Sequence, residues 1–586
     1  MTFLDSLTSD ERNIISDKLE VVHFKEGTCI IEQGAQGDGC YFIDEGRVRV
    51  EFDTGETDTD VVLNYLEPGQ VMGEFSLLDE QPRSASLFAH TDVTARWLST
   101  KAFRSIITYN TFIGAKLLTA ISLNLIQIVR HTNRQLADFM SYDASNQQVD
   151  ETVANAVQAQ KEFMDWSEDQ VDALLKDLAK TISNHAEVLA EASVVESGLG
   201  NKTDKIAKIQ FASQEVYNVI EGKPAAGLLQ YNDSNHIQEI ATPMGVVLGI
   251  IPLTNPVPTM IFKTLICIKS RNALIMSCHR NAMGVGNQAG EIIQDVLVKH
   301  GAPVNLVQWI KERSSRKLTN MFMRHRDVSF ILATGGPSIV KAAYSSGTPA
   351  IGVGAGNAPV YITKTADLEK TAKTIVGSKS FDNGVICGSE NNLVIDSEVQ
   401  DSFIEALKNN GAKVLNSEEI KKLTDAMFDP KTTKLQRDVI GKSALWIANK
   451  AEIEADETIK LLIVPQPLDQ VSGLYGQEKL APVLPLFPVT SESEALDICK
   501  NILIREGIGH TAIIHTEDKA LAERYALTVA ANRVLVNVGG SLGCIGGGNG
   551  LLPSLTLGCG TQGGTSTTDN VNYQNLLNIK RLAFPV

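Results

Sequence analysis

Several features that would assign the chain to a class at once are missing from it. None of the eight cysteines forms a C-x-x-C pair or stands in a zinc-like spacing with histidine, so no metal site is expected. The amino-terminal residues MTFLDSLTSDERN lack the basic start and the apolar core of a secretory signal. Without a signal, a disulfide framework is not expected either, and the predicted location is the cytoplasm.

Positive charge and long apolar runs are also scarce. The chain has 53 Lys and Arg against 69 Asp and Glu, a formal net charge of −16, which argues against a nucleic-acid partner. No window approaches the roughly 18 uninterrupted apolar residues of a membrane span, so we expect no transmembrane helix and no membrane partner. The 586 residues exceed what one hydrophobic core supports, so two or more domains are predicted.

Residues 1–140 have the pattern of a small β domain followed by a helix. Short runs rich in β-branched and aromatic residues alternate with glycine turns, which predicts the strands of a barrel or roll. Apolar residues at helical spacing then predict a long amphipathic helix. They are Ile113, Leu117, Ile121, Leu125, Ile128 and Leu136. The polar residues that follow place a linker at 141–164.

Residues 165–586 alternate between buried-strand and helix patterns. The runs GVVLGIIP, NALIMS, NLVQWI and VSFILAT, separated by helical segments, predict a doubly wound parallel sheet. A second set of runs follows: NNLVID, ALWIAN, LLIVP, HTAIIHT and RVLVNV. We therefore predict two α/β lobes, at about 165–350 and 351–545, and a C-terminal segment at 546–586.

One constellation in the β domain could bind an anion. In GEFSLLDEQPRSAS, a glycine, a short helical turn and an arginine follow one another. Backbone N–H groups and a guanidinium can hold a phosphate, and a glutamate can accept a hydrogen bond from a ribose hydroxyl. Without further context, an exposed Glu–Arg pair on a loop is the simpler interpretation.

This stretch resembles the phosphate-binding cassette of cyclic nucleotide-binding domains, and EQGAQGDGCYFIDEGRVRV is similar to that family's β-roll. The resemblance covers about residues 1–135. It implies that Glu74 binds the ribose 2′-hydroxyl and Arg83 the cyclic phosphate of cAMP or cGMP. The other implied binding residues are Gly73, Phe75, Ser84 and Ala85. Such a domain is expected to regulate the segment that follows it.

A second constellation surrounds one cysteine, Cys387 in FDNGVICGSE. A buried thiol is its simplest interpretation, a disulfide or a metal ligand is disfavoured, and a nucleophile stays open. In PLTNPVPT, Asn255 follows a buried strand, where its amide could donate to an oxyanion. The glycine turns ATGGPS and AIGVGAGNAP would let a ligand approach the backbone closely.

Six motifs in one order make residues 165–586 resemble the CoA-acylating aldehyde dehydrogenases. They are GVVLGIIPLTNP, ATGGPSIVKAAYSSGTPAIGVGAGNAP, FDNGVICGSE, GQEKLAPVLP, GIGHTAIIHT and PSLTLGCGTQGG. The resemblance implies an aldehyde dehydrogenase fold with a Rossmann-like cofactor lobe and an α/β catalytic lobe. It implies that Cys387 is the nucleophile and that Asn255 and the Cys387 N–H hold the oxyanion. The implied cofactor contacts are Thr334, Gly335, Gly336, Glu478, Ser277, Pro252 and Thr254, with Glu478 on the nicotinamide ribose.

One residue of the wider family is absent. Hydrolytic members carry a water-activating glutamate in E-L-G-G, whereas this chain has AIGVGAGNAP without a carboxylate. A thiol ionises more readily than water, so the expected reaction is reversible oxidation of a small aldehyde to acyl-CoA. Cys559 in LGCGTQGG is a weaker candidate for the nucleophile, and His510 is expected to line the cofactor or CoA cleft.

The identity of the ligands is less defined. The family's adenosine-ribose lysine has no counterpart in SCHRNA, so the cofactor is NAD or NADP. Acetaldehyde or propionaldehyde is the expected substrate, with succinate semialdehyde and sulfoacetaldehyde as charged alternatives. The chain is expected to form a homo-oligomer, a dimer or a tetramer. The alternative functions are a CoA-independent aldehyde dehydrogenase and an inactive sensor or scaffold that responds to a cyclic nucleotide.

Overall fold

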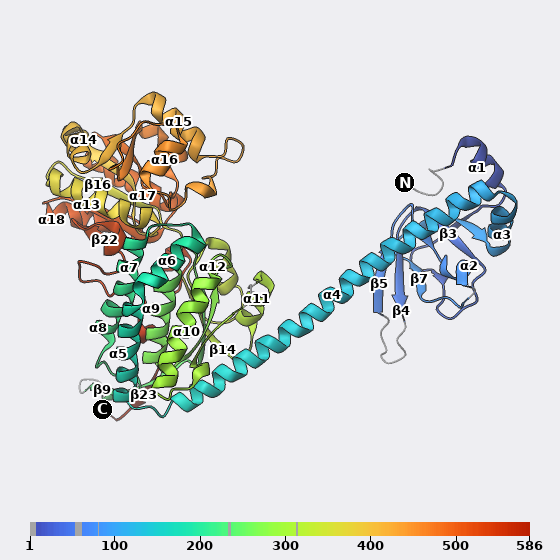
Figure 1. Ribbon diagram of the computed structural model, residues 1–586, viewed down its shortest axis with the longest axis horizontal. Helices are drawn as coiled ribbons and strands as arrows, with labels where there is room; N and C mark the ends of the chain where they lie inside the picture. Colours follow the sequence, from blue (N-terminus) through green and yellow to red (C-terminus); the bar gives the residue numbers. More distant parts are fainter. Residues whose placement is uncertain (1–6, 53–60, 80, 233–235, 312–314, 586) are drawn as a thin grey trace. The chain divides into compact units, whose positions relative to one another are not determined.

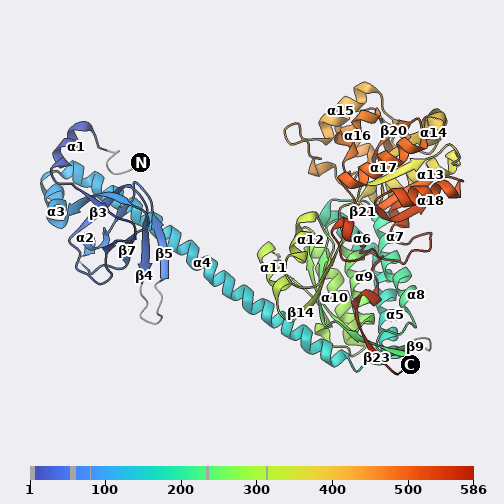
Figure 2. The same cartoon turned by 180° about the vertical axis from the view of Figure 1, so that it is seen from behind.

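The computed structural model describes residues 7–52, 61–79, 81–232, 236–311 and 315–585 (Figures 1 and 2). Its contacts divide the chain into a smaller unit, Met1–Ala144, and a larger unit, Ser145–Val586. Each unit has its own buried core, as expected for a chain of this length.

The smaller unit is a roll of two four-stranded antiparallel sheets. One sheet has the order β1 (Glu20–Phe24), β8 (Val93–Ser99), β3 (Gly39–Glu45) and β6 (Val71–Met72). The other has the order β2 (Cys29–Ile31), β7 (Ser86–Ala89), β4 (Val48–Phe52) and β5 (Val61–Leu66). Ile31, Ile43 and Leu87 pack together from both sheets, so the predicted β-roll is confirmed. Its short helices are α1 (Ser9–Ser16), α2 (Phe75–Asp79) and α3 (Thr100–Tyr109).

Helix α4, Thr111–Phe163, contains the predicted amphipathic helix and continues beyond it. Ile113, Leu117 and Ile121 lie in a core cluster of the smaller unit. Residues 141–164, the predicted linker, are almost entirely helical, and Val153 and Phe163 are fully buried in the larger unit. The linker prediction relied on polar composition alone. No glycine or proline interrupts 141–163, and apolar residues recur at helical spacing from Val149 onwards.

By length and composition, the first part of α4, Thr111–Arg130, could cross a membrane. Its buried residues, among them Leu117, pack against the β-roll, as those of a core helix do. A helix of this kind is weak grounds for a membrane span, and the expectation that the chain has none stays a prediction.

The first lobe of the larger unit is built on a five-stranded parallel sheet. Its order is β13 (Val307–Trp309), β12 (Ala273–Cys278), β11 (Val246–Ile251), β14 (Val328–Ala333) and β15 (Ala350–Gly352). Helices of this lobe are α5 (Glu168–Asn184), α6 (Ala186–Ser197), α7 (Lys202–Gln210), α8 (Val216–Ile220), α9 (Pro256–Lys269), α10 (Met283–Lys299), α11 (Arg316–Arg324) and α12 (Pro337–Tyr344). The strand order reverses between β11 and β14. Right-handed crossovers then put helices on both faces and open a crevice at the carboxyl ends of these two strands.

The second lobe is built on a seven-stranded parallel sheet. Its order is β18 (Ala412–Val414), β19 (Leu461–Pro465), β20 (Val483–Val489), β17 (Glu390–Asp396), β16 (Ala358–Ile362), β21 (Gly509–His515) and β22 (Ala531–Val536). Its helices are α13 (Leu368–Ser380), α14 (Gln400–Asn409), α15 (Ser417–Met427), α16 (Ala444–Lys450), α17 (Glu492–Arg505), α18 (Lys519–Thr528) and α19 (Gly540–Gly543).

The run ALWIAN was expected to be a strand, and that prediction is wrong: it forms helix α16. The Ser443 hydroxyl accepts a hydrogen bond from the N–H of Trp446 and so caps the helix. Ala444, Ile447 and Ala448 are buried at three- and four-residue spacing. A short apolar run suits a helix or a strand equally, and here the cap decides.

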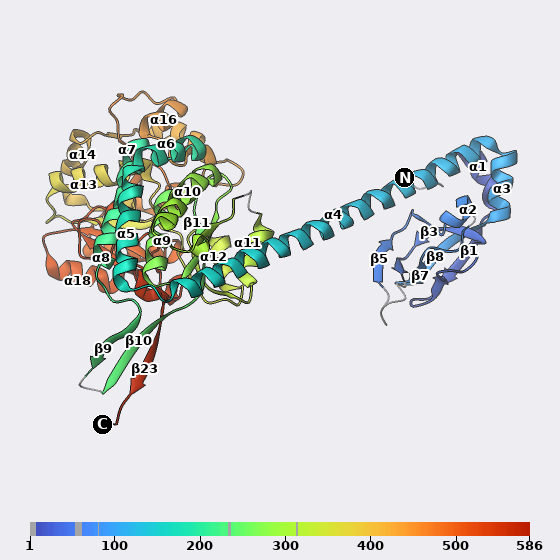
Figure 3. The same cartoon turned by 60° about the horizontal axis from the view of Figure 1, so that its bottom comes forward.

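A third, antiparallel sheet of the larger unit has the order β23 (Leu577–Ala583), β10 (Ile237–Pro243) and β9 (Gly227–Asn232). Figure 3 shows these strands extending from the body of the unit. The C-terminal segment thus returns to the first lobe, where Asn272 donates from Nδ2 to the carbonyl of Leu576 at 2.9 Å.

The packing of α4 gives a first testable prediction. Phe163 is fully buried in the core of the larger unit, so Phe163→Ala is expected to lower that unit's free energy of unfolding by about 3–5 kcal/mol. Asn155→Ala, at an exposed position of the same helix, is the control. Calorimetric unfolding of the full chain checks this, and equal transitions for wild type and Phe163→Ala would contradict the assignment of 145–163 to the larger unit.

Candidate functional site

Cys387 lies between a tight turn and strand β17. In the turn, Asp382 and Asn383 have φ of 47° and 55°, in the left-handed region. The carbonyl oxygen of Cys387 meets the opposite loop so closely that a Cβ at Gly356 would lie 1.8 Å from it. The thiol itself is half-buried, and it is therefore reachable.

The free thiol is held in its protonated form. Burial raises the pKa of Cys387 well above its ordinary value, and Cys544, Glu478 and Cys559 act in the same direction. Arg533 opposes this rise. A nucleophile here needs a ligand or a proton acceptor to become a thiolate.

The rival thiol, Cys559, is completely buried. Its backbone N–H donates to Thr565 Oγ1 at 2.8 Å, which fixes the glycine-flanked loop. Because a substrate must reach the nucleophile, the half-buried Cys387 is the better candidate of the two.

Asn255 precedes helix α9 at the carboxyl end of β11, in the crevice predicted by the strand order. Its Oδ1 accepts a hydrogen bond from Lys208 Nζ, and Lys208 also donates to Asp382 in the turn before Cys387. Among the described residues, the contact of Asn255 Nδ2 is Thr254 Oγ1 at 3.3 Å. The amide N–H groups therefore have room for a further acceptor.

The predicted cofactor residues of the first lobe lie at the same sheet edge. Pro252 and Thr254 follow β11, while Thr334, Gly335 and Gly336 follow β14 and lead into α12. A Cβ at Gly336 would meet nothing within 4 Å, so its backbone is open to a ligand. The carboxyl ends of neighbouring β11 and β14 bring these residues together.

Ser277 is buried near the carboxyl end of β12, with Oγ 3.2 Å from Thr319 Oγ1. Its contact with a cofactor stays a prediction.

Glu478 comes from the second lobe. Burial raises the pKa of its carboxyl to about 8, with repulsion by Glu506 adding to the rise, while Lys379 and a hydrogen bond from Gly356 oppose it. Its backbone N–H donates to Glu506 Oε2 at 2.8 Å. A carboxyl with this pKa can bind a hydroxyl-rich ligand in either protonation state.

Several functional candidates were missed or left open by sequence reasoning. His510 is buried, its Nδ1 lies 2.9 Å from Thr511 Oγ1, and its Nε2 has no partner among the described residues. Burial, then Arg533, lowers the pKa of His510 to about 3, so the ring is neutral. A Cβ at Gly388, next to Cys387, would lie 3.5 Å from this ring. Burial of a lone histidine has no sequence signal, and the same holds for Arg533 and Lys208.

The cassette of the smaller unit is a compact polar cluster. Arg83 donates to the carbonyls of Gly73 at 2.5 Å and Gly39 at 2.8 Å, and pairs with Asp38 at 3.2 Å. Glu74 accepts from Nδ2 of Asn124, on α4, at 2.9 Å. Burial raises the pKa of Glu74. A ligand phosphate would compete with Asp38, and a ribose hydroxyl with Asn124.

The other predicted cassette residues surround this pair. Phe75 opens α2 and is exposed, Ser84 is exposed, and Ala85 is half-buried just before β7.

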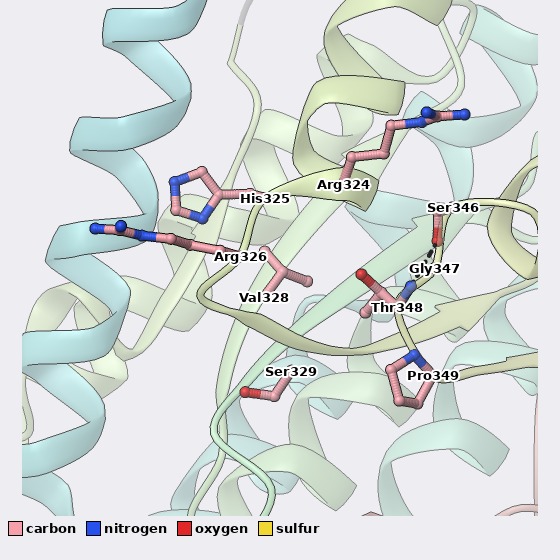
Figure 4. A pocket seen from close by; sticks show the side chains of 9 residues that line it. All are labelled: Arg324, His325, Arg326, Val328, Ser329, Ser346, Gly347, Thr348 and Pro349. Atoms are coloured by element: carbon pink, nitrogen blue, oxygen red, sulfur yellow. Dashed lines mark hydrogen bonds between the residues drawn. The ribbon is translucent and has the colours of Figure 1, made fainter.

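Two cavities are lined by residues other than the predicted site residues. One, of about 420 Å³, lies at the amino end of β14, and in Figure 4 its Arg324 and Arg326 point away from each other, so they do not converge on one ligand. The other, of about 520 Å³, is lined by Arg533 and by residues of the C-terminal loops, among them Asn570. Within the described ranges, no group of His, Cys, Asp and Glu could hold a metal ion.

Comparisons with known proteins match both parts of the chain. A model of the aldehyde dehydrogenase family matches residues 125–546, and one of the cyclic nucleotide-binding domain matches residues 21–110. Aldehyde-alcohol dehydrogenase 2 of Entamoeba histolytica is 40% identical over 448 residues, 75% of this chain and 51% of that protein. The chain thus spans about half the length of the first curated relatives it matches.

Other relatives are matched over nearly their whole length. The acetylating succinate-semialdehyde dehydrogenase of Clostridium kluyveri is 36% identical over 443 residues, 74% of this chain and 95% of that protein. The crystal structure of an acetylating aldehyde dehydrogenase from Geobacillus thermoglucosidasius has a TM-score of 0.73 and 39% identity, and covers 76% of this chain and 97% of that one.

The raised pKa of Cys387 predicts an unusual pH profile. Iodoacetamide modifies thiolates, so alkylation of Cys387 in the ligand-free chain is expected to accelerate about tenfold per pH unit and not to level off near pH 8.5, as an ordinary thiol does. Mass spectrometry of the Cys387 peptide measures the rate, with glutathione as the reference thiol. A plateau below pH 8 would show that the thiol is not held protonated.

The cassette geometry predicts which arginine binds the nucleotide. Arg83→Leu is expected to weaken binding of cAMP or cGMP to the full chain by on the order of 10- to 100-fold, because it removes charged hydrogen bonds to the phosphate. Arg96→Leu is the matched control, because the guanidinium of Arg96 pairs with Asp44 at 2.8 Å on the surface. Calorimetric titration decides, and equal affinities for both variants would place the phosphate elsewhere.

Proposed function

The chain belongs to the aldehyde dehydrogenase family and has an N-terminal cyclic nucleotide-binding domain, and on this basis we propose that it converts a small aldehyde to acyl-CoA, reversibly, under control of a cyclic nucleotide. Cys387 is the proposed nucleophile. Homologues named as acylating aldehyde dehydrogenases support the reaction class.

The observation that carries the proposal is a reachable thiol without a carboxylate in the loop opposite it. Residues 353–357 pack against Cys387 through Gly356, and they read Val-Gly-Ala-Gly-Asn. Val353 is buried and apolar, so this loop supplies no base for water. An acyl group on Cys387 therefore awaits a stronger nucleophile than water, and a thiol is one.

The chain's own residues account for the steps at sulfur. The Cys387 thiolate attacks the aldehyde carbon, and the carbonyl oxygen becomes an oxyanion. Asn255 Nδ2 and the Cys387 N–H donate to it, a contact worth about 3 kcal/mol in comparable sites. The bound nicotinamide cofactor supplies the hydride acceptor. An acyl thioester then remains on Cys387.

Transfer to CoA exchanges one thioester for another. The incoming thiol loses its proton to solvent and attacks the acyl carbon as a thiolate. The bond from the acyl carbon to Cys387 breaks, and the sulfur leaves as a thiolate. Since the bonds made and broken are alike, the reaction runs in both directions.

The residues present fit a dinucleotide. Open glycine backbone follows β14, and Glu478 lies within electrostatic reach of the Cys387 thiol. Neither feature chooses between NAD and NADP. The predicted cytoplasmic location and homo-oligomer also stay predictions.

Regulation is proposed to act through α4. Asn124 of this helix bonds to Glu74, the residue assigned to the ribose, so a cyclic nucleotide would change a contact that α4 makes. The same helix ends at Phe163 within the core of the larger unit. Control of activity requires that the nucleotide bind two states of the chain with different affinity.

The proposal predicts CoA-dependent reduction of NAD⁺ or NADP⁺ with an aldehyde panel that includes acetaldehyde, propionaldehyde and succinate semialdehyde. Cys387→Ala is expected to abolish turnover, and Asn255→Ala to lower kcat by about 10²–10³. Cys559→Ala is expected to keep CoA-dependent turnover, because its buried thiol takes no part. The absorbance of the reduced nicotinamide cofactor measures turnover in every case.

Three outcomes would change the proposal. Turnover without CoA would favour hydrolysis. Glu478 would then be the candidate base, because the charge of its carboxyl raises the pKa of the Cys387 thiol. Retained activity in Cys387→Ala would show that Cys387 is not the nucleophile. Equal rates with and without cAMP and cGMP, despite measured binding, would reject the regulatory part.

A further inference from the structure

A cluster of charged side chains is buried beneath the turn that leads to Cys387. Asp382, Lys205 and Lys208 are each at most 2% exposed. Asp382 Oδ2 accepts from Lys205 Nζ at 3.0 Å and also from Lys208 Nζ. Both lysines belong to α7, and Asp204 of the same helix accepts from the Asp382 N–H at 2.7 Å. The cluster therefore links the first lobe to the nucleophile turn of the second.

The two lysines of the cluster differ in their contacts. Burying an ammonium is costly, and well-packed apolar residues often serve stability better. Charge balance does not distinguish the two lysines, because Asp204 brings a second carboxylate to the cluster. Lys208 differs from Lys205 in having a further contact, the Oδ1 of Asn255.

This contact determines which end of the Asn255 amide faces the crevice. The two ends of an amide have the same shape but opposite hydrogen-bonding character, and an ammonium only donates. Lys208 therefore holds Oδ1 towards itself and turns Nδ2 away, with Thr254 Oγ1 at 3.3 Å as its contact among the described residues. An oxyanion needs the Nδ2 end.

The same ammonium also holds the second donor in place. Asp382, with φ of 47°, is in the turn that fixes the backbone before Cys387, and a Cβ at Gly200 would lie 1.8 Å from its Oδ1. Asp382 is thus confined on one side by Gly200 and bound on the other by Lys208. Lys205 and Asp204 bind Asp382 as well, so the turn keeps these two contacts when Lys208 is replaced.

We propose that Lys208 is a positioning residue for the oxyanion site, which it aligns by orienting the Asn255 amide. The inference rests on the proposed function, because it assigns Asn255 to the oxyanion. Lys208 touches neither aldehyde nor cofactor in this scheme, and its effect passes through Asn255.

Acylation of Cys387 by p-nitrophenyl acetate tests this without cofactor, CoA or the natural aldehyde. The thiol sulfur bonds to the ester carbon, the ester C–O bond breaks, p-nitrophenolate leaves, and the thiol proton passes to solvent. The tetrahedral oxyanion uses the same donors. The rate of the p-nitrophenolate burst is measured in the full-length wild type, Lys208→Met, Asn255→Ala and the double variant.

We expect Asn255→Ala to slow the burst by about 10²-fold and Lys208→Met by about 10- to 100-fold. The double variant is expected to match Asn255→Ala within about 3-fold, because residues that act through one another are not additive. Lys205→Met is the matched control: it removes a lysine from the same carboxylate without touching Asn255. The fold-changes in burst rate caused by Lys205→Met and Asn255→Ala are expected to multiply when the two substitutions are combined.

The outcomes distinguish a failure of the inference from a failure of the proposed function. If the effects of Lys208→Met and Asn255→Ala multiply, Lys208 does not act through Asn255 and the inference is wrong, while the proposed function stands. A wild-type burst that persists in Cys387→Ala overturns both. Should Lys208→Met fail to fold, Lys208→Gln replaces it. Its amide can still donate to Asn255, so the burst is expected to be faster than in Asn255→Ala, and an equal or slower burst overturns the inference.

Discussion

The contact between Gly356 and the Cys387 carbonyl is the constraint on which the site depends. A side chain at position 356 would overlap the backbone of Cys387, since its Cβ would lie 1.8 Å from the carbonyl oxygen. The loop between β15 and β16 must therefore run as bare backbone beside the nucleophile. That closeness brings Glu478, which is hydrogen-bonded by Gly356, into electrostatic range of the thiol. It also leaves Val353 buried rather than facing a substrate.

Buried polar groups lie on both sides of this contact, and they are stabilised differently on each side. Around Cys387, Glu478 and His510 burial favours neutral forms, as the direction of each pKa shift shows. Around Asp382, the carboxylate pairs with Lys205 and Lys208, and burial lowers the pKa of Lys208 to about 8 while its contact with Asp382 opposes this shift. The reacting side is thus weakly charged before ligands arrive, while the supporting side is held by strong hydrogen bonds. A charged ligand therefore changes the electrostatics around Cys387, whereas the cluster around Asp382 keeps its hydrogen bonds.

Much of the fold could be predicted because strands β11, β12 and β14 are continuous apolar runs between turns, as buried parallel strands must be. Cys387 and Asn255 could be found because each follows a recognisable motif. An error arose in α16, where local composition is ambiguous, and the helical structure of residues 141–164 was not predicted. Lys208 and Arg533 could not be assigned roles, because a charged residue looks exposed until tertiary contacts bury it. The pairing of β23 with β10 likewise depends on contacts distant in the chain.

That last pairing has a consequence for synthesis of the protein. Thr242 and Asn578, which are hydrogen-bonded across β10 and β23, are 336 residues apart in the chain. At about 5–20 residues per second, a ribosome needs roughly 20–70 s to cover that distance. Throughout this interval β10 lacks one neighbour and presents an open strand edge, a template for pairing with other chains. Nascent chains are therefore most exposed to aggregation before β23 emerges and pairs with β10.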